Sequence, residues 1–161
     1  MEIETAYRPG LIAEILQLHM DYYAPVWGLG STFEAYQARN LGDFLAQYDA
    51  NRDLIATVRH EGRLAASMVV DLTEPDAGQL RWFIINDALR GRGLGRTLME
   101  QACAHLDGSG VVRAWLSTYR GLDAALHLYG RFGFVRLSEE PDPWGSDLRY
   151  QVWERVRPTA G

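Results

Sequence analysis

Hydrophobic and polar positions follow two clear periods near the middle of the chain, and together they predict a strand, a loop and a helix. Residues 80–85 are a short apolar run of aromatic and β-branched side chains, which is typical of a buried strand. Farther on, apolar side chains recur every four residues, as on the inner face of an amphipathic helix: Leu94, Leu98, Ala102 and Leu106. A glycine-rich loop separates the two patterns, so we expect the helix to begin where the glycines end.

The same reasoning orders the rest of the chain. Helices are predicted from Pro9 to about Tyr23, from a cap at Ser31 onward, and over residues 121–132. Because Pro25, Gly28 and Gly30 interrupt it, the aromatic segment 21–30 is predicted to be a loop that carries rings. Further strands are expected at residues 2–6, 53–60, 64–72, 111–118, 134–137 and 148–156. The resulting order, β-α-α-β-β-β-α-β-α-β-β, predicts a mixed α/β fold with a largely antiparallel sheet and one parallel strand-helix-strand unit.

Composition narrows the classes of protein to consider. A chain of 161 residues fits a single domain spanning residues 1–161. It lacks a run long enough to span a membrane and a recognisable signal peptide, so we expect a cytoplasmic protein without a membrane partner. The net charge of −5 argues against nucleic acid as a partner. All basic residues are arginine, which excludes mechanisms that need a P-loop lysine or a Schiff-base lysine. The single cysteine, Cys103, falls on the apolar helix face and is predicted to be a buried thiol.

The glycine loop has the features of an anion site. Three glycines alternate with three arginines, in the order Arg90, Gly91, Arg92, Gly93, Leu94, Gly95 and Arg96. The first amides of the following helix lack partners within it, and the helix dipole favours a negative charge there. The loop does not fit the dinucleotide pattern G-x-G-x-x-G, and without lysine it is not a Walker loop. Phosphate binding by backbone amides is therefore the hypothesis.

Two motifs carry a resemblance to a known superfamily. Residues 90–95 have the form Arg-x-x-Gly-x-Gly between a strand and a helix, and residues 124–134, AALHLYGRFGF, are similar to the pattern Ala-x-x-Leu-Tyr-x-x-x-Gly-Phe. Both resemble the GNAT superfamily of acyl-coenzyme A dependent N-acyltransferases. The specific residues lie between about 80 and 134. The resemblance implies a sheet of about six to seven strands flanked by about four helices, with a parallel strand pair that splays apart at the cofactor site.

The resemblance also implies which residues hold acetyl-CoA. The backbone of Phe83, Ile84 and Ile85 would pair with the pantetheine arm. The loop would hold the pyrophosphate, with Thr97 offering a hydroxyl at the start of the helix. Ser117 or Thr118, on the next strand, would replace a cofactor-contacting Asn that relatives often carry before the second motif and that this sequence lacks. The full predicted set is Phe83, Ile84, Ile85, Arg90, Gly91, Arg92, Gly93, Leu94, Gly95, Arg96, Thr97 and Thr118. We expect the loop amides, whose geometry is fixed in advance, to contribute more to pyrophosphate binding than any single arginine. The alternative for the three arginines is that they only form a solvated basic rim.

Tyr129 stands where the superfamily often has its general acid, which protonates the departing thiolate. The alternative is that Tyr129 only packs beside the cofactor. A general base is not evident, because Gln79, Leu80 and Arg81 occupy the start of the central strand, where several relatives have a carboxylate. Glu74 and Asp76 flank Pro75 and fit a turn better than a catalytic role. Water and a main-chain carbonyl could instead take the proton of the amine.

The resemblance implies an amine acceptor, from a small molecule or a peptide. Rings from segments that border the acceptor cleft in relatives, Tyr22, Tyr23, Trp27 and Trp144, together with Asp142 and Asp147, would suit an alkylammonium or a peptide N-terminus. Alternatively the rings seal the edge of the core. The histidines are scattered, so a metal is not expected. A homodimer is compatible with the resemblance. Two rival functions are a sensor that binds coenzyme A without catalysis and an interaction module without a cofactor.

Overall fold

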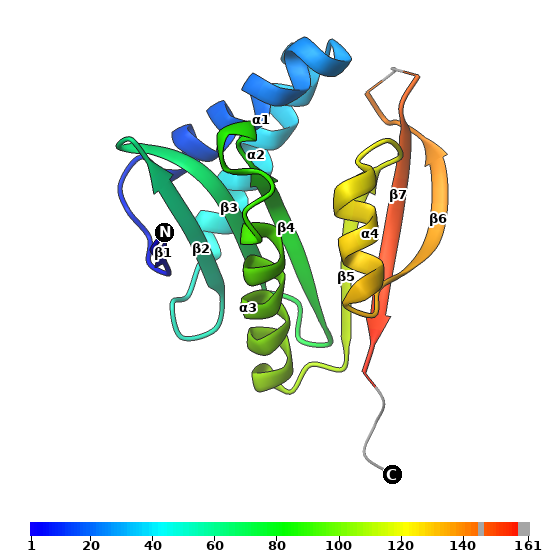
Figure 1. The fold of residues 1–161 in the computed structure, drawn as a ribbon. Helices are drawn as coiled ribbons and strands as arrows, with labels where there is room; N and C mark the ends of the chain where they lie inside the picture. The colour runs from blue at the N-terminus through cyan, green and yellow to red at the C-terminus, as the bar shows by residue number, and fades with distance from the viewer. Residues whose placement is uncertain (145–146, 158–161) are drawn as a thin grey trace.

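The computed structural model describes residues 1–144 and 147–157 (Figure 1). Its strands and helices follow the predicted order, and the mixed α/β fold class is confirmed. The strands form one seven-stranded sheet in the order β1-β2-β3-β4-β5-β7-β6. The elements are β1 (Ile3–Glu4), α1 (Leu11–Trp27), α2 (Ser31–Gln47), β2 (Leu54–His60), β3 (Arg63–Asp71), β4 (Ala77–Ile85), η1 (Asp87–Leu89), α3 (Leu94–Ser109), β5 (Arg113–Tyr119), α4 (Asp123–Arg131), β6 (Val135–Pro141) and β7 (Arg149–Val156).

Two hydrophobic clusters fill the two faces of the sheet. One packs the inner side of α3, including Leu98, Met99 and Leu106, against Met68 and Leu116. The other packs α1 and α2 onto the opposite face, where Ile15 and Phe44 meet Ile55 and Trp82. Figure 1 shows α3 and α4 in front of the sheet and α1 and α2 behind it. The period-four pattern of α3 therefore reflects burial, and Cys103 lies in this core as predicted.

The parallel pair β4–β5 is joined only at one end. Ala77, Gly78 and Gln79 pair with the stretch that begins at Arg113, and no pairing of the two strands continues beyond Gln79 and Trp115 within the described residues. Every other strand pair in the sheet is antiparallel. Beyond Gln79 the two strands separate, and the sheet divides into two arms that open toward the start of α3 (Figure 1).

A β-bulge in β4 lies where the strands part. Ser67 pairs with Ile84 and Val69 pairs with Arg81, so Met68 of β3 faces the two residues Trp82 and Phe83. Trp82 has φ +47°, a left-handed conformation that few non-glycine residues adopt, and the hydroxyl of Ser67 donates to its carbonyl at 2.5 Å. The bulge places Arg81 and Trp82 on the same face, with the guanidinium carbon 4.1 Å from the indole ring centre.

Two local predictions were wrong. The aromatic segment is not a loop, because α1 continues through Pro25 to Trp27 and ends at Gly28, which has φ +67°. Proline removes only one backbone donor, and ring packing, such as that of Tyr23 on Phe33 at 5.2 Å, stabilises the last turns. Ser31 is the first residue of α2 rather than its cap, and Gly30 precedes it without a side-chain cap bond. None of the helices in the described part of the chain is long and apolar enough to cross a membrane.

Candidate active site

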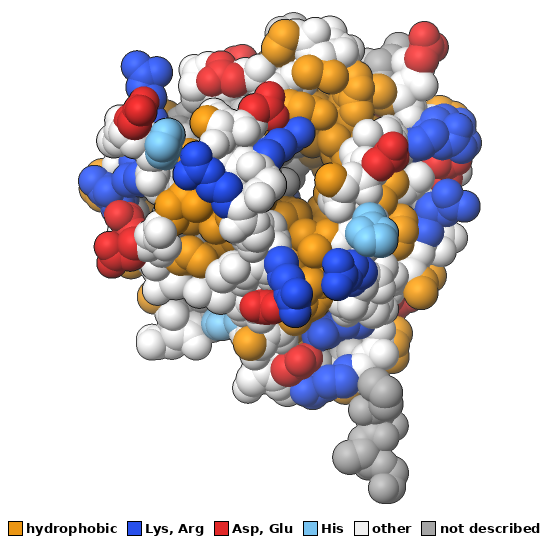
Figure 2. Space-filling view, in the orientation of Figure 1, with side chains coloured by type: hydrophobic (Ala, Val, Ile, Leu, Met, Phe, Trp, Pro, Cys, Tyr) orange, Lys and Arg blue, Asp and Glu red, His pale blue; other side chains and the backbone are white. Residues whose placement is uncertain are grey.

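A cavity of about 610 Å³ occupies the space between the separated ends of β4 and β5. Its wall is built by α1 and α2 on one side of the sheet and by the glycine loop, the start of α3 and α4 on the other. Figure 2 shows the molecule hollowed at this level, with hydrophobic side chains around the opening and basic side chains beside it. The cavity thus reaches both faces of the sheet through the gap that the strands leave.

The last part of β4 presents backbone groups to this cavity. Residues 80–85 pair with β3 on one side, while on the other side β5 has already moved away. Phe83, Ile84 and Ile85, predicted from the sequence, all lie in the cavity wall. Backbone N–H and C=O groups at a strand edge can pair with an extended ligand, as another strand would. The edge of β4 therefore offers a site for a linear amide-containing ligand.

The glycine loop joins this strand edge to α3. Gly91 and Gly93 have φ of +75° and +77°, and a Cβ built on either would have no heavy atom within 4 Å, so the loop borders open space. Gly93 is the cap residue of α3, whose first amides point into the loop. Gly91, Gly93, Leu94 and Gly95 line the cavity. At Gly95 the reason for glycine is different: a Cβ would approach Ile85 Cδ1 at 3.3 Å and Leu128 Cδ2 at 3.4 Å.

The loop arginines differ in position. Arg90 lines the cavity, pairs with Asp87 at 2.9 Å and places its guanidinium carbon 5.4 Å from the ring centre of Tyr22. Arg92 and Arg96 are exposed and lie outside the cavity wall, and Arg96 pairs with Glu100 one turn along α3. Thr97 also lies outside the wall, and its hydroxyl donates to the Gly93 carbonyl at 3.1 Å. Of these side chains, only Arg90 is placed to meet an anion within the cavity.

Tyr129 and Thr118, the predicted acid and its neighbouring cofactor residue, come together in the wall. Tyr129 of α4 is buried, and burial raises the pKa of its phenol well above the ordinary value of about 10, while an interaction with the Thr118 hydroxyl lowers it in part. The phenol therefore keeps its proton at neutral pH. A buried O–H that faces a cavity can donate a proton or a hydrogen bond to a group held there.

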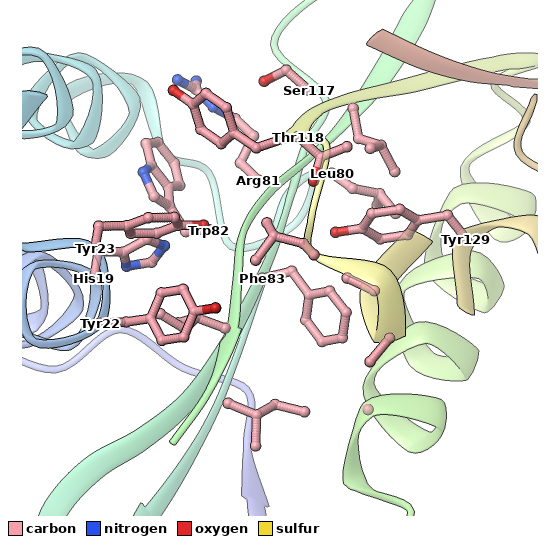
Figure 3. A pocket seen from close by; sticks show the side chains of 18 of the residues that line it. His19, Tyr22, Tyr23, Leu80, Arg81, Trp82, Phe83, Ser117, Thr118 and Tyr129 are labelled. Atoms are coloured by element: carbon pink, nitrogen blue, oxygen red, sulfur yellow. The ribbon is translucent and has the colours of Figure 1, made fainter. Parts of the chain in front are cut away.

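Tyr23 of α1 points into the cavity from the side opposite Tyr129, and Figure 3 shows the two phenol oxygens directed toward each other. Tyr22 lines the cavity beside it. Trp27 does not line the cavity but packs behind it, with its ring centre 5.4 Å from that of Tyr23 and 5.6 Å from that of Tyr119.

Trp144 reaches the cavity from the segment between β6 and β7. Its indole N–H donates to the Tyr119 hydroxyl at 2.5 Å, and its ring centre lies 4.1 Å from that of Tyr36. We use the term aromatic half for the part of the cavity bounded by Tyr23, Phe33, Tyr36, Tyr119 and Trp144, which come from α1, α2, β5 and the β6–β7 segment.

His19 is a cavity residue that the sequence did not reveal. It projects from α1 below Tyr23, whose ring stacks on it at 6.1 Å (Figure 3). Its Nδ1 lies 2.8 Å from the carbonyl oxygen of Ile15, and since a carbonyl only accepts, the neutral ring carries its proton on Nδ1 and a lone pair on Nε2. Burial lowers the pKa of His19 to about 4. In the sequence, His19 is only one more residue on the apolar face of a predicted helix, and nothing in that pattern indicates that the helix borders a cavity.

Carboxylates are scarce in the described cavity wall, where Asp123 at the start of α4 is the only one. Gln79 and Arg81 line the cavity at the start of β4, as the sequence indicated, and Arg81 pairs with Asp71 at 3.1 Å. Asp142 is buried and does not line the cavity, and it accepts a hydrogen bond from the backbone N–H of Trp144. Among the described residues, no group of three or more histidine, cysteine or acidic side chains is arranged to hold a metal ion.

Comparison with known proteins agrees with this geometry. The family model for the acetyltransferase (GNAT) family matches residues 12–134. A search of curated proteins gave no match.

Many solved structures share the fold. An acetyltransferase from Streptococcus agalactiae superposes with a TM-score of 0.72 at 16% identity, covering 96% of this chain and 97% of that one. The ribosomal-protein-S18-alanine N-acetyltransferase of Escherichia coli gives 0.70 at 20% identity, covering 99% and 96%. Ard1 from Thermoplasma volcanium gives 0.72 at 16% identity, covering 98% and 97%. At these identities the likeness concerns the fold.

Proposed function

Since the chain belongs to the acetyltransferase (GNAT) family, we propose that it transfers an acetyl group from acetyl-CoA to a primary amine of a small molecule or a peptide, by direct attack. One observation carries the proposal: β4 and β5 part beyond Gln79 and Trp115, which leaves a backbone edge open to a cavity that begins at the N-terminus of α3. We also propose that residues 1–161 form a single N-acetyltransferase domain.

The residues present fit coenzyme A on structural grounds. The open space beside Gly91 and Gly93 and the free amides at the start of α3 suit a pyrophosphate, and Arg90 adds a cation at the same place. The edge of β4 from Phe83 to Ile85 suits the amide groups of a pantetheine arm. Acetyl-CoA would supply an activated thioester. The side chains of Arg92, Arg96 and Thr97 have smaller roles in this proposal, because they lie outside the cavity wall.

Two groups of the chain would assist the chemistry. Backbone N–H groups at the β4 edge would stabilise negative charge that develops on the carbonyl oxygen during attack. Tyr129, which burial keeps protonated, would donate its proton to the departing sulfur. With a neutral amine, the carbon–sulfur bond would break as a carbon–nitrogen bond forms, and the nitrogen would lose one proton while the sulfur gains one. The proton from nitrogen would return to Tyr129 through solvent. An acceptor that binds as an ammonium would first release one further proton to solvent.

A second function is favoured by one observation, namely that the described wall has no carboxylate at the start of β4. A protein that binds acetyl-CoA as a sensor would not need a base. Both functions predict tight binding of the cofactor, and only the enzyme predicts transfer.

The experiment mixes the protein with acetyl-CoA and a panel of primary amines and follows the release of free thiol. Amine-dependent release at a rate well above the rate without protein is the expected result. Tight binding of acetyl-CoA, measured by calorimetry, with no release for any amine would favour the sensor instead.

A further inference from the structure

The aromatic half of the cavity is a continuous set of rings. The ring of Tyr23 lies 5.2 Å from that of Phe33 and 6.3 Å from that of Tyr119. The ring of Trp144 lies 6.0 Å from that of Phe33 and 4.1 Å from that of Tyr36. All five side chains line the cavity. A ligand in this half therefore meets flat, apolar surfaces that belong to four different segments.

These rings also connect the two arms of the divided sheet. Phe33 and Tyr36 belong to α2, which covers the arm that ends in β4, while Trp144 and Tyr119 belong to the arm formed by β5, β6 and β7. Trp144 contacts both sides, through its ring on Tyr36 and through its N–H on the Tyr119 hydroxyl. Side-chain contacts therefore cross the aromatic half from one arm of the sheet to the other. An extended peptide could pass through it only by breaking the contacts of Trp144 with Tyr36 and Tyr119.

The charges of the cavity do not suit a polycation. Its described wall carries two cations, Arg81 and Arg90, and a single carboxylate, Asp123 at the start of α4. Asp142, which the sequence suggested as a partner for a cation, binds the backbone of its own segment. Arg81 pairs with Asp71 at 3.1 Å, which offsets part of its charge. A single ammonium group can still be stabilised by tyrosine and tryptophan rings, whose faces attract cations.

From the rings, their contacts and the single carboxylate of the described wall, we infer that the acceptor is a small primary amine with one aromatic or flat apolar body and no second charge, of the arylalkylamine class. This inference rests on the proposed acetyl transfer and names its substrate class. It predicts that polyamines, which need several carboxylates, and peptides, which need an open groove, are poor acceptors.

The test compares 2-phenylethylamine, spermidine and an uncharged peptide amide with an N-terminal alanine. Thiol release with acetyl-CoA gives kcat/KM for each, and calorimetry on the protein saturated with CoA gives the dissociation constant for each amine. We expect 2-phenylethylamine to exceed both others by about tenfold or more in each measurement, which is the scale that burial of one apolar group provides.

Matched variants localise the effect. Tyr36→Ala removes a ring of the aromatic half and should raise the KM and the dissociation constant of 2-phenylethylamine, with the affinity for acetyl-CoA unchanged. Tyr7→Ala removes an exposed ring that does not line the cavity and should change neither.

The two proposals fail separately. Better transfer to, or tighter binding of, spermidine or the peptide would overturn the substrate class while leaving acetyl transfer intact. If no amine were acetylated, the acetyl-transfer proposal would fail, and the calorimetric ranking alone would decide whether the pocket selects an arylalkylamine.

Discussion

Thr118 and Tyr129 meet through their hydroxyl groups in the cavity wall, and both side chains are buried. Burial favours the protonated phenol, whereas the Thr118 hydroxyl partly stabilises the phenolate. Tyr129 is thus held as a proton donor beside the separated strands. Acid catalysis is the role that we propose for it.

Tyr129→Phe should lower kcat by about 10²-fold or more, the usual contribution of a positioned acid, with little change in the affinity for acetyl-CoA. Thiol-release kinetics and calorimetry separate the two effects. Because the pKa of Tyr129 is raised, the wild-type rate should not fall through its ionisation anywhere below about pH 10. Tyr7→Phe is the control at an exposed position. An unchanged kcat in Tyr129→Phe would remove Tyr129 as the acid.

Gly93→Val should abolish or severely weaken the binding of acetyl-CoA. Gly93 has φ +77°, where a β-branched residue is strained by about 1–3 kcal/mol, so the loop would move away from its present path. Gly42→Ala, within α2 and with open space around the added Cβ, is the matched control and should bind normally with equal or greater stability. Calorimetry measures binding, and circular dichroism verifies that both variants fold. A folded Gly93→Val that binds as tightly as the wild type would disprove the pyrophosphate assignment.

The elements around Gly93 were predictable because their signals are local. The apolar run of β4, the glycines and the period of α3 lie next to one another, and each pattern determines one element. The parallel pairing of β4 with β5 followed from the helix between them. In this region the local sequence pattern agrees with the structure, because the apolar side chains that define the pattern are the ones that fill the core.

The features that the sequence did not predict depend on contacts between segments that are distant in the chain. Pro25 normally ends a helix, yet the rings around it pack on α2 and β5, which the local sequence does not encode. The bulge at Trp82 depends on the register with β3 and on Ser67. His19 reached the cavity wall because α1 borders the separated strands. Asp142, a candidate from the sequence, is buried outside the described cavity wall, which also depends on how the β6–β7 segment packs. The parts of the site that depend on tertiary placement were therefore the least predictable.

Arg90 and Arg96 allow a paired test of the loop charges. Arg90→Gln should weaken the binding of CoA by roughly three- to tenfold, since it removes a cation at the predicted pyrophosphate position, equivalent to about 1 kcal/mol. Arg96→Gln should have little effect, because Arg96 pairs with Glu100 outside the cavity wall. Acetyl-pantetheine, which lacks the pyrophosphate, should bind equally to all three proteins. Equal losses in both variants would instead indicate a diffuse electrostatic effect.

His19 should make the folded protein sensitive to acid in a defined window. Its pKa is about 4 in the folded state because burial disfavours the charged ring, compared with about 6.5 in an unfolded chain. The unfolded state therefore binds more protons between these values, and the free energy of unfolding falls as the pH drops from about 6.5 to about 4. The full loss from this group is on the order of 3 kcal/mol.

His19→Asn keeps a side chain that can donate to the Ile15 carbonyl but does not titrate. Urea unfolding at several pH values should show that the wild type loses about 3 kcal/mol more than this variant between pH 7 and pH 4. His127→Asn, at an exposed position on α4, should follow the wild type throughout. A constant difference between the wild type and His19→Asn over this range would show that the acid sensitivity comes from other groups.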